Sequence, residues 1–444
     1  MFIDRAFDEI AKKNKVVIGF DLRDDYSQIS YCRAEQSMPD TFSLVMGEEQ
    51  YNIPTILCRK FSDESESVWL IGKDALRAAS VGEGILIENL VTLAKNNENS
   101  KLQEDEFEAN FLLEIFIKKA LSKVSAYLGT DEIGAITFTL NDMNPQIMEV
   151  LRNIMYNIKG KKTEVYFLSN EDCFFQYIIH QPEEMWIHDV ILYDYRNEGV
   201  KSQILQTNRK TSPVACFVET NNFPQMKMPD MIETDDSAKE VLYRQLDEKL
   251  LEIVQQQCED RYISSIFLLG DNFSKHWCKE SLKYMCKSRR VFQGNNLFSK
   301  GACYGARERL FPSTLSKSYV YLSDEKLKSN IGMKCNKGQE EIYFPILDAG
   351  INWYDAKKEF DVMLVKNNII TLTISPLDGG NTKIASISLD GLKVRGNKTN
   401  RVGLKFFMNA PNILEIEIKD KGFGEIFPST GQVWKESLKL EFFN

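Results

Sequence analysis

The clearest hydrophobic pattern in the chain is a hairpin that occurs twice. Residues 16–29 (VVIGFDLRDDYSQI) form an apolar run, a short polar tip and a second apolar run, and residues 190–204 (VILYDYRNEGVKSQI) repeat this order. Asp21 corresponds to Asp194, and the two stand 194 minus 21, or 173, residues apart. That spacing indicates a duplicated domain rather than a solenoid repeat. Two like halves that face each other leave a cleft between them.

The sequence after the first hairpin alternates predicted strands and helices. After a predicted strand over 68–71, polar, charged sequence up to about Asp105 predicts a loop and an irregular edge of the domain. Apolar residues at a spacing of three to five over 112–128 predict a long helix that ends at Gly129. A strand, helix, strand order then predicts a parallel sheet. The other predicted elements are strands over 53–57, 68–71, 135–140 and 164–168 and a helix over 145–158.

The hydrophobic pattern is less regular after the second hairpin, and it changes in the last third of the chain. Residues 209–236 show little periodicity, and Ser237 is predicted to cap a helix. A strand ends at Gly270, and small residues over 301–306 predict a helix that packs closely on its neighbours. From about Leu315, short alternating runs with Gly and Asn turns predict a separate antiparallel β domain. Its predicted strands cover 369–374, 384–389, 402–407, 413–418 and 438–443, with a Gly379–Gly380 turn.

Composition narrows the functional classes. The 444 residues carry a net charge of −9 with no long basic cluster, which argues against nucleic acid as a partner. No apolar run is long enough to cross a membrane, so we expect a cytoplasmic protein. Nine scattered cysteines and three histidines predict neither a disulfide framework nor a zinc site.

Several short motifs together resemble the Hsp70 chaperone family of the actin, Hsp70 and sugar-kinase superfamily. GFDLRDDYS and YDYRNEG stand where that family has its two phosphate loops, and SNEDCFFQY is similar to its connecting motif. IPTILCRK, LIGKDA, IFLLGD and NNLFSKGACYGA follow in the family's order. LKFFMNAPNILEIEIKDKGFGE resembles the substrate-binding β-sandwich.

The resemblance implies an α/β fold with a particular domain order. A duplicated ribonuclease-H-like (actin-like ATPase) two-lobed domain is expected over 1–314. Lobe I would span about 1–187, and lobe II, with a shortened outer subdomain, about 188–314. An antiparallel β-sandwich is expected over 315–444, without the helical lid of the family.

The resemblance also implies a nucleotide site. Asp21, Asp194 and Glu171 would be the catalytic residues, and the two aspartates would hold Mg²⁺ through water beneath the phosphates of ATP or ADP. The implied nucleotide- or anion-binding residues are Arg23, Ser27, Arg196, Gly199, Gly270, Asp271, Gly301 and Gly305.

The two tips depart from what a phosphate loop requires. Glycine and threonine are replaced by Arg23-Asp24-Asp25 at the first tip, and three glycines by Arg196-Asn197-Glu198 at the second. Carboxylates close to phosphate oxygens repel them by several kcal/mol in a medium of low dielectric constant. The stretch from Asp194 to Leu268 is also about half as long as in the family. We therefore expect ATP to bind weakly, if at all.

Each candidate residue also has a structural interpretation. Asp21 and Asp194 stand at strand ends, where Asp commonly caps a turn, and Glu171 stands at an ordinary helix start. Arg23 and Arg196 either hold an anion together or pair with neighbours in their own tips, for which the candidates are Asp24, Asp25 and Glu198.

These interpretations lead to two hypotheses about function. The preferred one is a degenerate nucleotide-binding scaffold, a pseudo-ATPase, whose β-sandwich binds a protein or an extended peptide. The alternative is an active Hsp70-like ATPase and chaperone. Because no lid follows the sandwich, peptide binding is expected to be weak or to rest on strand addition at a sheet edge.

Overall fold

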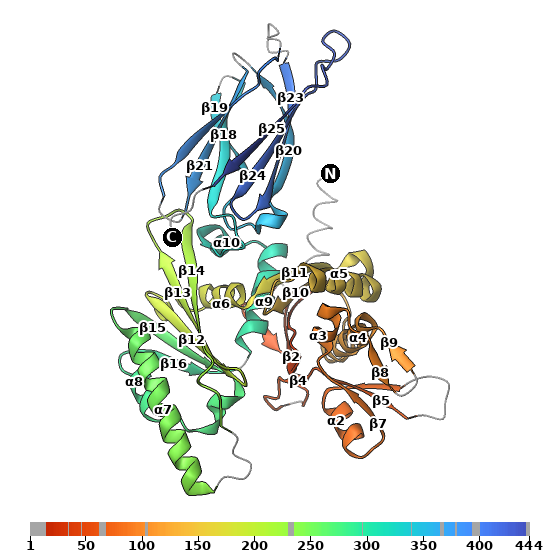
Figure 1. Ribbon diagram of the computed structural model, residues 1–444, viewed down its shortest axis with the longest axis vertical. Coiled ribbons are helices and arrows are strands. Elements are labelled where there is room, and N and C mark those ends of the chain that lie inside the picture. The colour runs from red at the N-terminus through yellow and green to blue at the C-terminus, as the bar shows by residue number, and fades with distance from the viewer. Residues whose placement is uncertain are drawn as a thin grey trace. The chain divides into compact units, whose positions relative to one another are not determined.

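The chain folds as a mixed α/β protein with several sheets (Figure 1). The computed structural model describes residues 15–440 except 34, 46, 62–67, 103–104, 230–234, 295, 339, 365–367, 378–379 and 393–399. Contacts divide the chain into two compact units. The first unit comprises Met1–Leu205 and Val218–Ser316, and the second comprises Gln206–Phe217 and Lys317–Asn444.

The first sheet of the first unit is built around the predicted hairpin. Strand β1 pairs antiparallel with β2 and parallel with β10, and β10 pairs parallel with β11, as the strand, helix, strand pattern predicted. The order is β11-β10-β1-β2-β3, with β4 beside β2. The strands are β1 (Val16–Asp21), β2 (Tyr26–Arg33), β3 (Asp40–Thr41), β4 (Ile53–Pro54), β10 (Ile133–Leu140) and β11 (Glu164–Ser169).

The second sheet repeats this arrangement around the second hairpin. Strand β12 pairs antiparallel with β13 and parallel with β15, and β15 pairs parallel with β16. The order is β16-β15-β12-β13-β14-β17. The strands are β12 (Asp189–Arg196), β13 (Gly199–Asn208), β14 (Val214–Phe223), β15 (Ile263–Leu269), β16 (Arg290–Gln293) and β17 (Tyr319–Tyr321).

The long helices follow the predicted pattern closely. Helix α4 (Ala109–Leu128) ends at Gly129 in the left-handed conformation, and α5 (Pro145–Lys159) begins at its proline. Helix α7 (Asp236–Cys258) is capped by the Asp235 side chain and not by Ser237, which corrects the prediction by two residues. The other α-helices among the described residues between 109 and 318 are α6 (Asn170–Ile179), α8 (Glu280–Met285), α9 (Leu297–Leu310) and α10 (Thr314–Ser318).

The prediction of a loop between residue 71 and about Asp105 is wrong. This stretch of the chain, residues 72–105, contains two helices and the strand β7, which completes a three-stranded sheet in the order β6-β5-β7 with the strand predicted over 68–71 as β6. Its buried contacts are made largely by small side chains such as Ala75 and Ala78, which give a weak hydrophobic pattern in the sequence. The elements are β5 (Leu57–Lys60), β6 (Val68–Ile71), α2 (Gly72–Ser80), β7 (Gly84–Ile87), α3 (Leu90–Asn96), β8 (Ser100–Leu102) and β9 (Asp105–Phe107).

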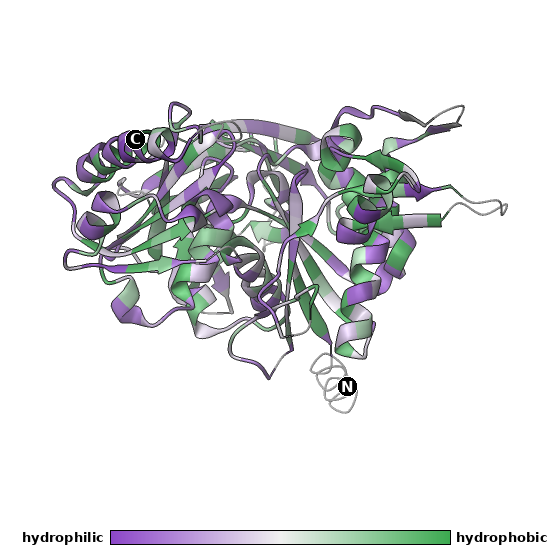
Figure 2. Cartoon of the chain, turned by 90° about the horizontal axis from the view of Figure 1, so that it is seen from below, coloured by the Kyte–Doolittle hydropathy of each residue, from purple (hydrophilic) through white to green (hydrophobic). Residues whose placement is uncertain are grey.

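The middle of the first unit is built from α6 and α9, which lie between the two sheets in Figure 1. The two helices pack so closely that a Cβ atom on Gly301 of α9 would overlap the carbonyl oxygen of Cys173 in α6. The small residues predicted for this helix are therefore required by packing. Figure 2 shows hydrophobic residues along the central strands and hydrophilic ones on the outer helices.

The second unit contains two antiparallel four-stranded sheets, in the orders β19-β18-β21-β22 and β20-β23-β24-β25. They enclose one hydrophobic cluster that includes Leu372, Leu404 and Ile416. The strands are β18 (Ser329–Lys337), β19 (Glu340–Leu347), β20 (Lys357–Leu364), β21 (Ile369–Pro376), β22 (Lys383–Ser388), β23 (Asn400–Ala410), β24 (Ile413–Asp420) and β25 (Val433–Lys439). Gly379 of the predicted turn and the end of the strand predicted over 438–443 lie outside the described residues.

Two features differ from the predicted division of the chain. Residues 209–236 were expected to lack periodic structure, but they contain the ten-residue strand β14. Gln206–Phe217 belongs to the second unit, although the sequence placed it in lobe II. The reason is local packing, since Ala215 contacts Leu322 and Leu377. No helix among the described residues is long and apolar enough to cross a membrane.

Candidate functional site

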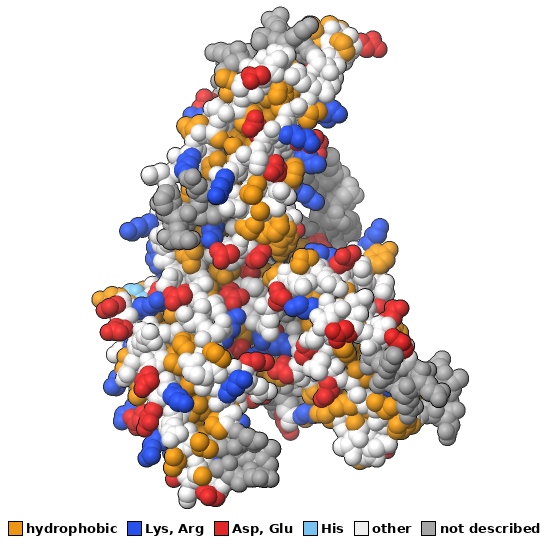
Figure 3. Space-filling model, viewed as in Figure 1, with side chains coloured by type: hydrophobic (Ala, Val, Ile, Leu, Met, Phe, Trp, Pro, Cys, Tyr) orange, Lys and Arg blue, Asp and Glu red, His pale blue; other side chains and the backbone are white. Residues whose placement is uncertain are grey.

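Two adjoining cavities lie at the tips of the repeated hairpins in the first unit. The larger has a volume of about 560 Å³ and the smaller about 330 Å³. Arg23, Asn141, Arg196 and Glu198 line both cavities. We call the two cavities together the interlobe cleft. In the space-filling view, acidic and basic side chains lie side by side in this region (Figure 3).

Asp21 is buried, and both oxygens of its carboxylate contact a neighbouring arginine. Nε of Arg23 donates to Oδ1 and Oδ2 of Asp21 over 3.0 and 3.1 Å, and the two side chains are 7% and 2% exposed. Burial raises the pKa of Asp21 above its ordinary value, and the charges of Arg23 and Arg196 only partly offset this. The Arg23 guanidinium also lies over the Phe298 ring. Asp21 therefore has a cation in contact with it that the chain itself supplies.

Asp194 has the same arrangement in the second hairpin. Nε of Arg196 donates to Oδ1 and Oδ2 of Asp194 over 3.0 and 2.8 Å. Nη1 of Arg196 reaches Oδ2 of Asp25 in the first tip over 3.4 Å, and its guanidinium lies over the Tyr26 ring. Burial would lower the pKa of Arg196, but the charge of Asp194 raises it above its ordinary value. Arg196 is thus held as a cation between the two tips.

Asp24 has a different structural role. Its carboxylate accepts hydrogen bonds from the amides of Val91 and Thr92 over 2.8 and 3.1 Å, and from the Thr92 hydroxyl over 2.6 Å. These groups form the first turn of helix α3, whose free N–H groups attract an anion. The carboxylate of Asp24 therefore caps the N-terminus of α3.

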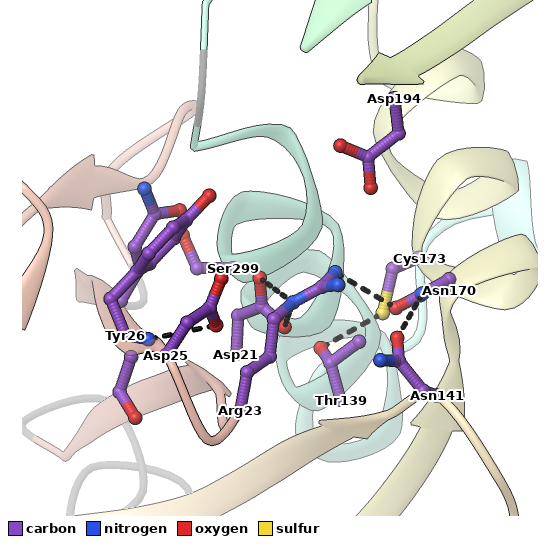
Figure 4. Close-up of polar contacts among 12 residues, drawn as sticks. Asp21, Arg23, Asp25, Tyr26, Thr139, Asn141, Asn170, Cys173, Asp194 and Ser299 are labelled. Carbon is purple, nitrogen blue, oxygen red and sulfur yellow. Dashed lines mark hydrogen bonds and ion pairs between the residues drawn. The ribbon is translucent and has the colours of Figure 1, made fainter. Parts of the chain in front are cut away.

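Arg23 is also oriented by a pair of amides that the sequence analysis missed. Its Nη2 donates to Oδ1 of Asn170 over 3.3 Å, and Nδ2 of Asn170 donates to Asn141 over 2.6 Å. Figure 4 shows Arg23 between Asp21 and Asn170, with Asp194 pointing toward the same space from the opposite side. The motif match drew attention to Glu171, whereas its neighbour Asn170 makes this contact.

Glu171 is engaged by side chains of the second hairpin. Its Oε1 accepts from Nζ of Lys201 and Nε2 of Gln203, each over 2.9 Å, and from the Thr220 hydroxyl over 3.4 Å. Burial alone would raise the pKa of Glu171, but Lys201 lowers it below its ordinary value. This ionised, paired carboxylate joins α6 to β13.

The pairing of Glu171 predicts a pH dependence of stability. Because the folded-state pKa lies below the ordinary 4.5, the pair stabilises the protein above that pH, and the contribution is lost as the pH falls through the folded-state pKa. Glu171→Gln should therefore flatten the loss of unfolding free energy between pH 7 and pH 3, measured by urea denaturation. Glu83→Gln removes the exposed Lys60–Glu83 pair and should change the profile less. Parallel profiles for the wild type and Glu171→Gln would contradict the assignment.

The residues present do not fit the Mg²⁺ that the resemblance implies. Both oxygens of Asp21 and both of Asp194 already accept from guanidinium groups, so a divalent cation there would meet two positive charges. Among the described residues, no group of three or more His, Cys, Asp or Glu side chains is placed to hold a metal ion. The tips therefore present ion pairs where a metal and phosphates would be expected.

Comparison with protein-family models identifies the family of the chain. A model described as "Family of unknown function (DUF5716) C-terminal" matches residues 38–324. The chain belongs to the DUF5716 family. A second model, described as "Domain of unknown function (DUF8552)", matches residues 326–440. A search of curated proteins found no match. In this DUF5716 protein, the two matched regions meet close to Lys317, where the long stretch of the second unit begins.

The remaining predicted nucleotide-binding residues of this DUF5716 chain do not lie together in the structure. Gly199 lines the smaller cavity. The Ser27 hydroxyl is buried against that of Thr55 at 2.8 Å, and Asp271 is exposed and absent from the described lining of both cavities. These two residues are better explained by packing and by an exposed turn than by a ligand.

The three other predicted glycines are accounted for by close packing. A Cβ atom on Gly270 would overlap the carbonyl oxygen of Tyr195, and one on Gly305 would overlap the Leu168 side chain. Gly301 has the contact with Cys173 described above. None of the three is among the described residues that line the interlobe cleft.

Proposed function

We propose that this protein is a divergent, non-enzymatic member of the actin and Hsp70 superfamily, in which the two-lobed domain serves as a scaffold. The repeated sheet supports the superfamily assignment. In each half, an antiparallel hairpin is followed by two parallel strands in the same order, which is what a duplicated ribonuclease-H-like fold requires.

One observation carries the proposal that the cleft is not an ATPase site. Each aspartate that would hold Mg²⁺ is bound through both oxygens by the arginine two residues later. Admitting a metal would require these guanidinium groups to leave, and separating a buried ion pair costs several kcal/mol.

The rest of each tip supports the same conclusion. Asp24 is committed to the start of α3, and Asp25 to Arg196. Glu171, the third residue of the implied catalytic set, is paired with Lys201. Asp25–Arg196 and Glu171–Lys201 each join one hairpin region to the other half, so both pairs bridge the two halves.

The second unit supplies the proposed binding surface for a protein partner. Its sheets end in β19, β22, β20 and β25 among the described strands. Ile384 of the edge strand β22 is 73% exposed. An edge strand with exposed side chains can accept an extended segment by strand addition, with main-chain hydrogen bonds as the principal attraction.

Calorimetric titration with ATP and with ADP, each with Mg²⁺, tests the proposal. We expect no heat of binding at millimolar nucleotide for the full chain, because Arg23 and Arg196 already pair with the two aspartates that would hold Mg²⁺. Asp21→Ala is titrated alongside as the matched variant. Micromolar binding to the wild type that disappears in Asp21→Ala would overturn the scaffold proposal and establish the active ATPase instead.

A further inference from the structure

A second groove lies in the first unit, away from the interlobe cleft. It has a volume of about 570 Å³ and runs between strand β6, the start of α2 and one side of helix α4. None of its lining residues belongs to the hairpin tips. The proposed function of the cleft therefore does not explain this groove.

One end of the groove is apolar. Trp69 of β6 forms its buried floor, and Ile115 and Phe111 of α4 line its side. Phe111 is 48% exposed, and its ring stacks on Phe107, which in turn meets Trp69 edge to face. Because the Phe111 ring packs on Phe107, it has less side-chain freedom to lose on binding, which lowers the entropic cost.

The other end of the groove is basic. Lys118, Lys119 and Lys123 of α4 line it, and the acidic residue in the described lining is Asp74, which pairs with Lys123 over 3.0 Å. Lys118 and Lys119 are exposed. The groove therefore presents an apolar anchor site and a net positive charge along one helix.

The spacing along α4 defines what would match both ends. Phe111 and Lys118 are seven residues apart, which is about 10 Å at the helical rise of about 1.5 Å per residue. A second helix lying along α4 has the same rise. An apolar residue and an acidic residue seven positions apart on that helix would meet Phe111 and Lys118 together.

We propose that this groove binds an amphipathic helical segment of a partner protein that carries an apolar anchor and, two turns away, a cluster of acidic residues. The apolar end supplies most of the attraction, as in other helix-in-groove complexes. The lysines fix the direction of the segment and select against basic sequences, since charge complementarity acts mainly on specificity.

Fluorescence anisotropy with a synthetic peptide tests this proposal on the full chain. The probe is a labelled 18-residue helical peptide with a Phe anchor, a Leu anchor four positions later, and Glu residues seven, eight and twelve positions after the Phe. We expect saturable binding that Lys118→Glu combined with Lys119→Glu weakens by about tenfold or more, as expected when exposed ion pairs are replaced by repulsion. Phe111→Ser should weaken binding independently of salt concentration.

Matched controls separate this site from general electrostatic attraction. Lys161 and Lys162 are adjacent exposed lysines in the same half of the first unit, outside the lining of the groove. Lys161→Glu combined with Lys162→Glu should leave the affinity unchanged. A peptide with Lys in place of each Glu should bind the Lys118→Glu, Lys119→Glu variant better than it binds the wild type.

Three results would overturn the proposal. One is no saturable binding of the acidic peptide to the wild type. The second is equal weakening by the two pairs of lysine substitutions, which would indicate non-specific charge attraction. The third is a wild-type dimer in gel filtration that Lys118→Glu with Lys119→Glu converts to monomer, which would make a second copy of the chain the occupant.

Discussion

Replacing Arg23 by methionine is expected to lower the free energy of unfolding by about 3–5 kcal/mol, because it leaves the buried Asp21 carboxylate without its partner. Asp21 is 2% exposed, and both oxygens of its carboxylate accept from the Nε–H of this one arginine. The measurement is urea denaturation followed by circular dichroism at pH 7. Arg77→Met, at an exposed position of α2, is the control and should change the stability by less than about 0.5 kcal/mol.

The pH dependence of Arg23→Met provides a second test of the same contact. Burial already raises the pKa of Asp21, and Arg23 is the largest influence that lowers it. Without Arg23 the folded state should bind a proton at Asp21 more readily than the unfolded state does. Stability then falls as the pH rises, so the variant should be less destabilised at pH 5 than at pH 7.

A double variant distinguishes a broken ion pair from lost packing. Asp21→Leu combined with Arg23→Met removes both charges, and apolar replacement of a whole buried pair is often close to neutral. It should therefore recover most of the stability that Arg23→Met loses. A double variant as unstable as Arg23→Met would show that packing of the Arg23 side chain, and not the unpaired carboxylate, causes the loss.

The arginine pairs could have been predicted better from the sequence than they were. Residues two apart on a strand lie on the same face, and Asp194 and Arg196 both belong to β12. The partners expected from the sequence were Asp24, Asp25 and Glu198, within the tips. Of these, Asp25 does contact Arg196, but across the cleft and not within the same tip. The repeated Asp-x-Arg spacing was the signal for a local pair.

Other contacts of the site had no local signal. Asp24 caps a helix that begins 66 residues later, and Asn170 meets Arg23 from 147 residues away. Such contacts depend on how the strands and helices pack together. The helices α4 and α5 were predicted well because large apolar residues repeat along them, while α2 was missed because alanines make its buried face.

Gly301 separates the two interpretations of the small-residue helix α9. The resemblance to Hsp70 implies a nucleotide contact there, whereas the structure places Gly301 against the backbone of Cys173. In the first case Gly301→Ala would alter ligand binding and leave the fold intact. In the second it would force α6 and α9 apart, because backbone atoms, unlike a flexible side chain, cannot turn away.

We expect Gly301→Ala to lower the free energy of unfolding by about 3 kcal/mol, at the upper end of the usual cost of overpacking a core. Gly294→Ala is the matched control, since nothing lies within 4 Å of the added Cβ and its backbone is not left-handed. It should change stability by less than about 0.5 kcal/mol. Equal unfolding midpoints in urea for Gly301→Ala and the wild type would contradict the packing assignment. A large loss of unfolding free energy for Gly301→Ala but not for Gly294→Ala would show that the contact between α6 and α9 requires glycine at position 301. That requirement does not depend on a bound nucleotide.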